Sequence, residues 1–141
     1  MKKQKIDYVY HATYQSKFSN IKKKGLLIDR KKNWDGENKM KALYFDLDKN
    51  CAGDFAECSD YMEEYEEYII ILAVKFEDIN KNKIIEDINI SKDTENTSFA
   101  YTENIPSDKI FICNLTDNKN IKYIPINSVN KLSQKYYYNN Y

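Results

Sequence analysis

The run Tyr68-Ile69-Ile70-Ile71-Leu72-Ala73-Val74-Lys75-Phe76, YIIILAVKF, is a continuous apolar stretch rich in β-branched residues. A stretch of this kind, without the alternation of a half-exposed strand, is typical of a strand that is buried on both faces. We therefore expect it to be the most buried strand of the fold.

Shorter apolar segments on both sides of this run predict the other elements. A helix is expected over 16–24, with Phe18 and Ile21 inward and Gly25 as its end. A second helix should begin near Cys51 and bury one face, and the acidic segment 60–68 continues or follows it. That face is made of Cys51, Ala52, Phe55 and Ala56. Strands are expected over 6–10, 42–45, 68–76, 84–90, 97–102, 110–115 and 121–126. Early helix-bearing segments followed mostly by strands predict an α+β fold with a largely antiparallel or mixed sheet.

Length, charge and cysteine content narrow the class of protein. The chain has 141 residues, which suits one domain, expected over 1–130 and followed by a polar aromatic tail over 131–141. Lys+Arg and Asp+Glu both number 22, so no net field attracts nucleic acid or an anionic membrane. The odd set Cys51, Cys58 and Cys113 shows no metal-binding spacing and indicates reduced thiols. No segment approaches the roughly 20 apolar residues of a membrane span, so we expect a cytoplasmic protein.

The segment Tyr8 to Thr13, YVYHAT, holds the only histidine of the chain, His11. A single histidine at the end of a strand is more often structural than catalytic. Paired acids such as Glu63 and Glu64 indicate a solvated helix face, and three glycines are too few for a phosphate-binding loop. Taken singly, these residues define no reaction.

Taken together, several of these residues form a pattern. His11 is followed by Thr13, by a helix and by Gly25-Leu26, and a short strand then carries Tyr44. Phe55 lies eleven positions after Tyr44, and Tyr44 lies 33 positions after His11. Over residues 6–58 this pattern resembles the ADP-ribosyltransferase superfamily, in particular its poly(ADP-ribose) polymerase-like branch. In that branch a strand ends in His-Gly-Ser or His-Gly-Thr, and a later strand carries Tyr-Phe.

The resemblance implies a single-domain fold with a split, mixed or antiparallel β-sheet, and NAD as co-substrate without a metal. His11 would then hydrogen-bond the adenosine-side ribose. The backbone of Ala12 and the hydroxyl of Thr13 would hold the nicotinamide amide. Tyr44 and Phe55 would sandwich the nicotinamide ring, and such stacking is worth about 1 kcal/mol per ring.

Two positions depart from the family pattern. Ala12 stands where the family has glycine. The family's glutamate, which binds the nicotinamide ribose, corresponds to Thr97 or Ser98, and neither is acidic. Glu95 lies just before this point and Glu103 just after it, so either is a candidate, and Glu103 joins His11 and Tyr44 as the expected catalytic set.

The missing glutamate argues against elongation of a poly(ADP-ribose) chain and favours transfer of a single ADP-ribose unit. We therefore expect a mono-ADP-ribosyltransferase that modifies a protein. Its small size suits a bacterial or phage effector that acts in the cytoplasm of the producing or infected cell. The loop over 29–41, with Trp34 and Asp35, either contributes to binding of NAD or of the target, or is a solvated loop with one packed tryptophan. A catalytically inactive binding module and an NAD glycohydrolase are the alternatives. The sequence specifies neither the acceptor group nor the oligomeric state.

Overall fold

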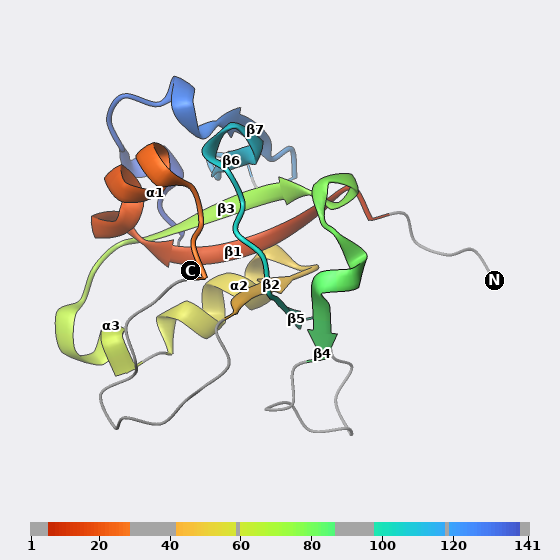
Figure 1. Ribbon diagram of the computed structural model, residues 1–141. Coiled ribbons are helices and arrows are strands. Elements are labelled where there is room, and N and C mark those ends of the chain that lie inside the picture. Colours follow the sequence, from red (N-terminus) through yellow and green to blue (C-terminus); the bar gives the residue numbers. More distant parts are fainter. Residues whose placement is uncertain (1–5, 29–41, 59, 87–97, 118, 139–141) are drawn as a thin grey trace.

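The computed structural model describes residues 6–28, 42–58, 60–86, 98–117 and 119–138. They form a seven-stranded sheet in the order β4-β5-β2-β1-β3-β6-β7, in which every pair of neighbours is antiparallel (Figure 1). The strands are β1 Tyr8–Tyr14, β2 Leu43–Asp46, β3 Ile69–Lys75, β4 Ile84–Glu86, β5 Ser98–Tyr101, β6 Ile110–Asn114 and β7 Lys122–Pro125. The helices are α1 Phe18–Lys24, α2 Lys49–Glu57 and α3 Asp60–Tyr65, with short 3-10 turns between the strands. The α+β class with an antiparallel sheet is confirmed.

The most buried of these strands is β3, next to the central strand β1, as the apolar run at 68–76 predicted. Its residues from Ile69 to Val74 are all buried, and it pairs with β1 on one edge and β6 on the other. Alternate side chains enter two cores, one beneath α1 and one beneath α2. The α1-side core includes Val9, Phe18, Ile21, Leu43, Phe45, Ile70, Leu72, Tyr101, Ile112 and Tyr136. The α2-side core consists of Ala56, Ile69, Ile71, Ala73 and Cys113.

Strand β1 is longer than expected and lies further along the chain. It covers Tyr8–Tyr14 instead of 6–10, because every one of its residues pairs with β3. His11 therefore lies in the middle of a strand and not at its end. Tertiary pairing with β3 extends the strand through residues whose local pattern gave no such signal.

Helix α1 agrees with its prediction. Phe18 and Ile21 are buried, and Gly25 ends the helix with φ 80°, its N–H donating to the Ile21 carbonyl at 2.8 Å. Directly after it, Leu26 exchanges two backbone hydrogen bonds with Ile105, at 2.8 and 2.9 Å. The end of α1 is thus fixed to the turn that follows β5.

Helix α2 buries Ala52 and Ala56 as predicted, but not the other two residues of the predicted face. Ala52, Gly53 and Ala56 are buried, whereas Phe55 is 76% exposed and Cys51 is exposed. The small residues allow the helix to lie close to the sheet, and the ring of Tyr138 fills the space beside Gly53. The prediction that Phe55 and Cys51 point inward was wrong for this reason.

Residues 132–138, expected in a polar tail, pack against the rest of the fold. Tyr136 is 5% exposed within the α1-side core, and Tyr138 donates its backbone N–H to the Ile69 carbonyl at 2.8 Å. The Tyr138 hydroxyl donates to Asp54 Oδ1 at 2.7 Å, with the Asn50 carbonyl at 3.2 Å as a second acceptor. This segment therefore belongs to the domain, and its Tyr138 side chain packs against α2 and hydrogen-bonds to it.

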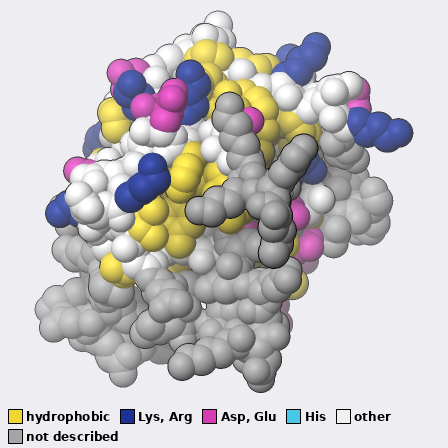
Figure 2. Space-filling view, turned by 90° about the vertical axis from the view of Figure 1, so that its right-hand side faces the viewer, with side chains coloured by type: hydrophobic (Ala, Val, Ile, Leu, Met, Phe, Trp, Pro, Cys, Tyr) yellow, Lys and Arg dark blue, Asp and Glu magenta, His cyan; other side chains and the backbone are white. Residues whose placement is uncertain are grey.

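Charged groups of both signs lie around an apolar patch on the face shown in Figure 2, in keeping with the equal numbers of acidic and basic residues. Cys51, Cys58 and Cys113 are free, and burial raises the pKa of the Cys113 thiol to about 12. Within the described ranges, no helix has the length and apolar character needed to cross a membrane.

The contact between Gly53 and Tyr138 gives a first prediction. Alanine favours a helix over glycine by about 1 kcal/mol. A Cβ at position 53, however, would lie 2.5 Å from the Tyr138 ring. We expect Gly53→Ala to displace the ring and to lower the free energy of unfolding by about 1 kcal/mol, because a charge-assisted hydrogen bond is lost. Urea denaturation measures this change.

In a Tyr138→Ala background the same Gly53→Ala substitution should stabilise the protein, since the ring is gone and only helix propensity remains. A stabilising effect of Gly53→Ala in both backgrounds would contradict the role given to Tyr138.

Candidate functional site

The sheet splits between β1 and β2. The two strands share one register pair, Tyr10 with Asp46, whereas β1 pairs with β3 over its whole length. Beyond Tyr10 the described residues of β1 and β2 form no further pair. A split of this kind leaves part of the backbone of two neighbouring strands outside the strand ladder.

His11 occupies the point where the pairing stops. Its Nδ1 lies 2.8 Å from the carbonyl oxygen of Tyr44. Because a carbonyl only accepts hydrogen bonds, Nδ1 carries the hydrogen. The imidazole is 9% exposed and lies 5.6 Å from the ring of Phe45. The structure therefore joins His11 to the backbone of the predicted partner Tyr44, across the split.

This hydrogen bond takes an acceptor that the strand pairing would otherwise use. Since Tyr10 is opposite Asp46, a continued antiparallel ladder would place Ala12 opposite Tyr44. The Tyr44 carbonyl would then accept from the Ala12 N–H. The imidazole of His11 replaces that donor and keeps the two strands apart.

The backbone of Ala12 points toward the split. Gln15 donates its N–H to the Tyr68 carbonyl at 3.0 Å, and Asp7 accepts from the Phe76 N–H at 2.9 Å. Odd-numbered residues of β1 therefore bond toward β3, and even-numbered residues point to the opposite edge. Ala12 lies in extended conformation without a positive φ, so its side chain causes no backbone strain.

The two predicted aromatic rings are both exposed. Tyr44 is 46% exposed, and it alternates with Leu43 and Phe45, which belong to the α1-side core. Its ring therefore leaves β2 toward the face that carries α2. Phe55 projects from α2 and is 76% exposed. No ring contact joins these two described side chains.

Thr13 is buried at 9% exposure on β1, two residues after His11 and on the same face. His11 and Thr13 thus lie on the α1 side of the split, whereas Tyr44 and Phe55 lie on the α2 side. The sheet therefore separates the side chains of His11 and Thr13 from the two predicted rings.

The two described candidates for the missing acidic position, Ser98 and Glu103, lie at opposite ends of β5. Ser98 begins the strand and is opposite Asp46 on β2, while Tyr101 ends it opposite Leu43. Glu103 follows as an exposed turn residue that accepts a hydrogen bond from the Tyr101 hydroxyl at 3.0 Å. Burial raises the pKa of Tyr101. Glu103 is therefore held at the opposite end of β5 from Ser98.

Several predicted contributors lie outside the described residues. They are Trp34 and Asp35 of the loop over 29–41, and Glu95 and Thr97 before β5. In the described part, no group of three His, Cys, Asp or Glu side chains could hold a metal ion.

Sequence reasoning missed Asp46, which is 9% exposed. The buried polar side chains of the described part are His11, Thr13 and Asp46, and all three border the split. The available signal was a carboxylate two positions after Tyr44, at the end of an apolar strand.

Tyrosine side chains contact one another at the end of the split where β1 and β2 are still paired. The hydroxyls of Tyr10 and Tyr123 are 2.6 Å apart, and the ring of Tyr123 stacks on Tyr8 with centroids 3.9 Å apart. Burial and the hydrogen bond with Tyr123 hold the pKa of Tyr10 well above its usual range, so this residue stays neutral. Tyr10 is thus a rigid support for the register pair with Asp46.

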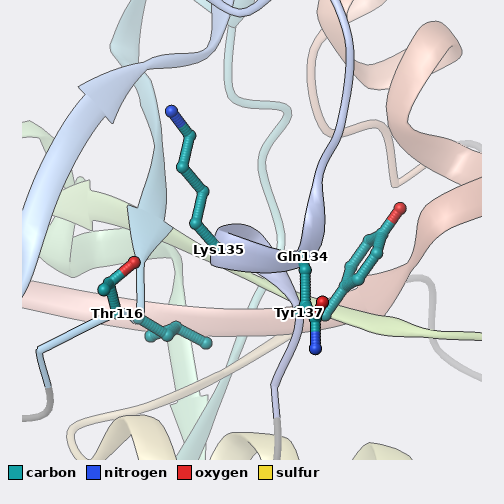
Figure 3. A pocket seen from close by; sticks show the side chains of 5 residues that line it. Thr116, Gln134, Lys135 and Tyr137 are labelled. Carbon is teal, nitrogen blue, oxygen red and sulfur yellow. The ribbon is translucent and has the colours of Figure 1, made fainter.

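A separate pocket of about 280 Å³ lies at the far side of the sheet, where β6 ends beside residues 134–136 (Figure 3). It is lined by Leu115, Thr116, Gln134, Lys135 and Tyr137. Figure 3 shows Lys135 and Tyr137 pointing in different directions, so their polar ends do not converge on one point. None of its lining residues borders the split.

Comparisons with known proteins found no matching family model, no matching curated protein and no matching solved structure. The functional assignment therefore rests on the residues at the split and on their geometry.

Proposed function

We propose that the protein is a mono-ADP-ribosyltransferase that uses NAD to modify a protein target. The observation that carries the proposal is the hydrogen bond from His11 to the Tyr44 carbonyl across the split. It links the two residues that the motif spacing selected, at the point where the pairing of β1 with β2 stops.

The reaction needs positioning more than acid-base chemistry. Nicotinamide is a good leaving group, so a site gains most by orienting the ribose and stabilising an oxocarbenium-like charge. The hydrogen bond from Nδ1 of His11 to the Tyr44 carbonyl fixes the orientation of the imidazole at the split. This arrangement suits the ribose contact that the family resemblance assigns to His11.

Ala12 suits recognition of a carboxamide. A carboxamide offers one carbonyl oxygen and one NH₂ group. In an antiparallel strand the N–H and C=O of one residue point to the same edge, and those of Ala12 point toward the split. One residue can therefore bind both halves of the nicotinamide amide. Thr13 would add its hydroxyl, and Tyr44 and Phe55 would stack on the pyridine ring.

The absence of an acid at Ser98 favours transfer of a single ADP-ribose unit. A protein is the favoured target because acidic and basic residues are equal in number, at 22 each, and do not create an attractive field for nucleic acid. Action as a bacterial or phage effector in the cytoplasm is part of the same proposal.

Labelled NAD tests the proposal. Incubated with a cell lysate, the protein should transfer label to a discrete protein band. Tyr44→Ala should reduce labelling about fivefold or more, because loss of ring stacking costs about 1 kcal/mol or more. Tyr65→Ala is the matched control, since Tyr65 is an exposed aromatic at 59% that lies on α3 and outside the split.

The alternatives give different results in this experiment. Nicotinamide release without a labelled macromolecule would indicate an NAD glycohydrolase. Absence of both label and nicotinamide release would contradict an enzymatic function and favour a binding module.

A further inference from the structure

We infer that two copies of the chain form a symmetric dimer through the surface around Tyr68 and Tyr137. In this dimer the acidic helix α3 of each copy lies over the pocket at Lys135 of the other. The surface does not include the split between β1 and β2, so the inference goes beyond the enzymatic proposal and does not depend on it.

Two stacked tyrosines form the centre of this surface. The rings of Tyr68 and Tyr137 are 4.4 Å apart between centroids and 6° from parallel. Tyr137 packs against the α1-side core, whereas Tyr68 is 62% exposed. Large aromatic side chains on a rigid base are the ones that most often anchor protein interfaces. The Tyr68 ring is therefore suited to contact another protein molecule.

Opposite charges adjoin the two rings. The segment 60–68, which contains α3 and ends at Tyr68, has five acidic residues and no basic one. Among its described side chains, Glu63, Glu64 and Glu66 are exposed and form no ion pair. The segment 115–138, which contains Tyr137, has four lysines and one aspartate. The net charge of zero therefore hides two oppositely charged segments that meet at the tyrosine stack.

The pocket of about 280 Å³ beside Tyr137 belongs to the basic half of the surface (Figure 3). Because its polar side chains do not converge on one point, it suits the side chains of a protein surface better than one small ligand. Lys135 is exposed at its edge, with its ammonium 5.2 Å from the centre of the Tyr136 ring. No described carboxylate pairs with Lys135, so a glutamate of another molecule can approach it.

Hydrogen bonds hold the acidic half in place. Ser16 donates its N–H and its hydroxyl to the two carboxylate oxygens of Glu67, each at 2.9 Å, which ties the end of α3 to the turn after β1. Glu66 follows α3 with φ 51° and donates its N–H to the Met62 carbonyl at 3.1 Å. A surface that is fixed before association loses less conformational entropy when it binds.

A second copy fits this surface because the surface is complementary to itself. Helix α3 adjoins the Tyr68 ring, and the pocket adjoins the Tyr137 ring. A two-fold rotation about an axis near the stack would therefore place α3 of each copy over the basic pocket of the other. Both contacts then form at once, and the assembly closes as a dimer.

Sedimentation velocity of the full chain tests the inference. We expect a dimer at about 0.1 M salt and a shift toward monomer at about 1 M, because the Debye length falls from about 10 Å to about 3 Å. A wild-type protein that stays monomeric at about 0.1 M salt would overturn the inference.

Charge reversal tests which surface forms the dimer. Lys135→Glu, and separately Glu63→Lys combined with Glu64→Lys, should each weaken the dimer at least about tenfold, because two-fold symmetry makes every reversed charge act twice. Mixed with each other, the two variants should dimerise again, since every contact between them pairs opposite charges. Lys83→Glu is the matched control, because Lys83 is exposed and lies just before the edge strand β4, and it should leave the dimer unchanged.

Two results would contradict this surface. A dimer that Lys135→Glu and the Glu63 and Glu64 reversals leave intact would lie on another face of the molecule. Failure of the two variants to pair with each other, although urea denaturation shows that both are folded, would exclude the contact between α3 and the pocket.

Discussion

Gly25→Ala is expected to lower the free energy of unfolding by about 3 kcal/mol or more, since it combines backbone strain with a steric clash. Gly25 has φ 80° and ψ −169°, a conformation that is essentially restricted to glycine. A Cβ there would lie 2.2 Å from the Ile105 carbonyl oxygen. That oxygen accepts the Leu26 N–H, so relief of the clash would break the link between α1 and the turn after β5.

Urea denaturation of Gly25→Ala and of Lys24→Ala measures this effect. Lys24 is an exposed residue in the last turn of α1, and its replacement should change stability by less than about 0.5 kcal/mol. A similarly small change for Gly25→Ala would show that the end of α1 is not held as described.

His11→Val is expected to separate function from stability. Without the imidazole, the Tyr44 carbonyl loses its donor, and the Ala12 N–H opposite it can take that place. Valine favours strands, so the split should close with little loss of stability. Label transfer should fall about 100-fold, because the ribose contact and access to the Ala12 backbone are lost together.

Two measurements check this expectation. Transfer of labelled ADP-ribose gives the loss of activity, and amide hydrogen exchange at Ala12 reports the closed ladder as slower exchange. Transfer by His11→Val within about twofold of the wild-type rate would show that the imidazole has no role in NAD binding.

Local signals predicted a large part of the fold. The continuous apolar run at 68–76 identified β3, and Gly25 identified the end of α1, because burial on both faces and a positive φ leave clear marks in the sequence. The extent of β1 was not predictable locally, because its pairing with β3 determines it. The buried face of α2 depends on Tyr138, which comes from the other end of the chain.

The candidate site was predicted in part. Residue spacing selected His11 and Tyr44, and the structure joins them through the Tyr44 backbone. Asp46 was missed because its position opposite Ser98 is a property of strand register, and no spacing along one strand reveals the register between two distant ones.

Whether NAD binds at the split beside His11 is tested most directly by the free energy of unfolding with and without NAD. At about 100 times its dissociation constant, NAD should stabilise the wild-type protein by about 2.7 kcal/mol. The same concentration should leave His11→Val essentially unchanged. No stabilisation of the wild-type protein by NAD, or equal stabilisation of both proteins, would contradict NAD binding at this site.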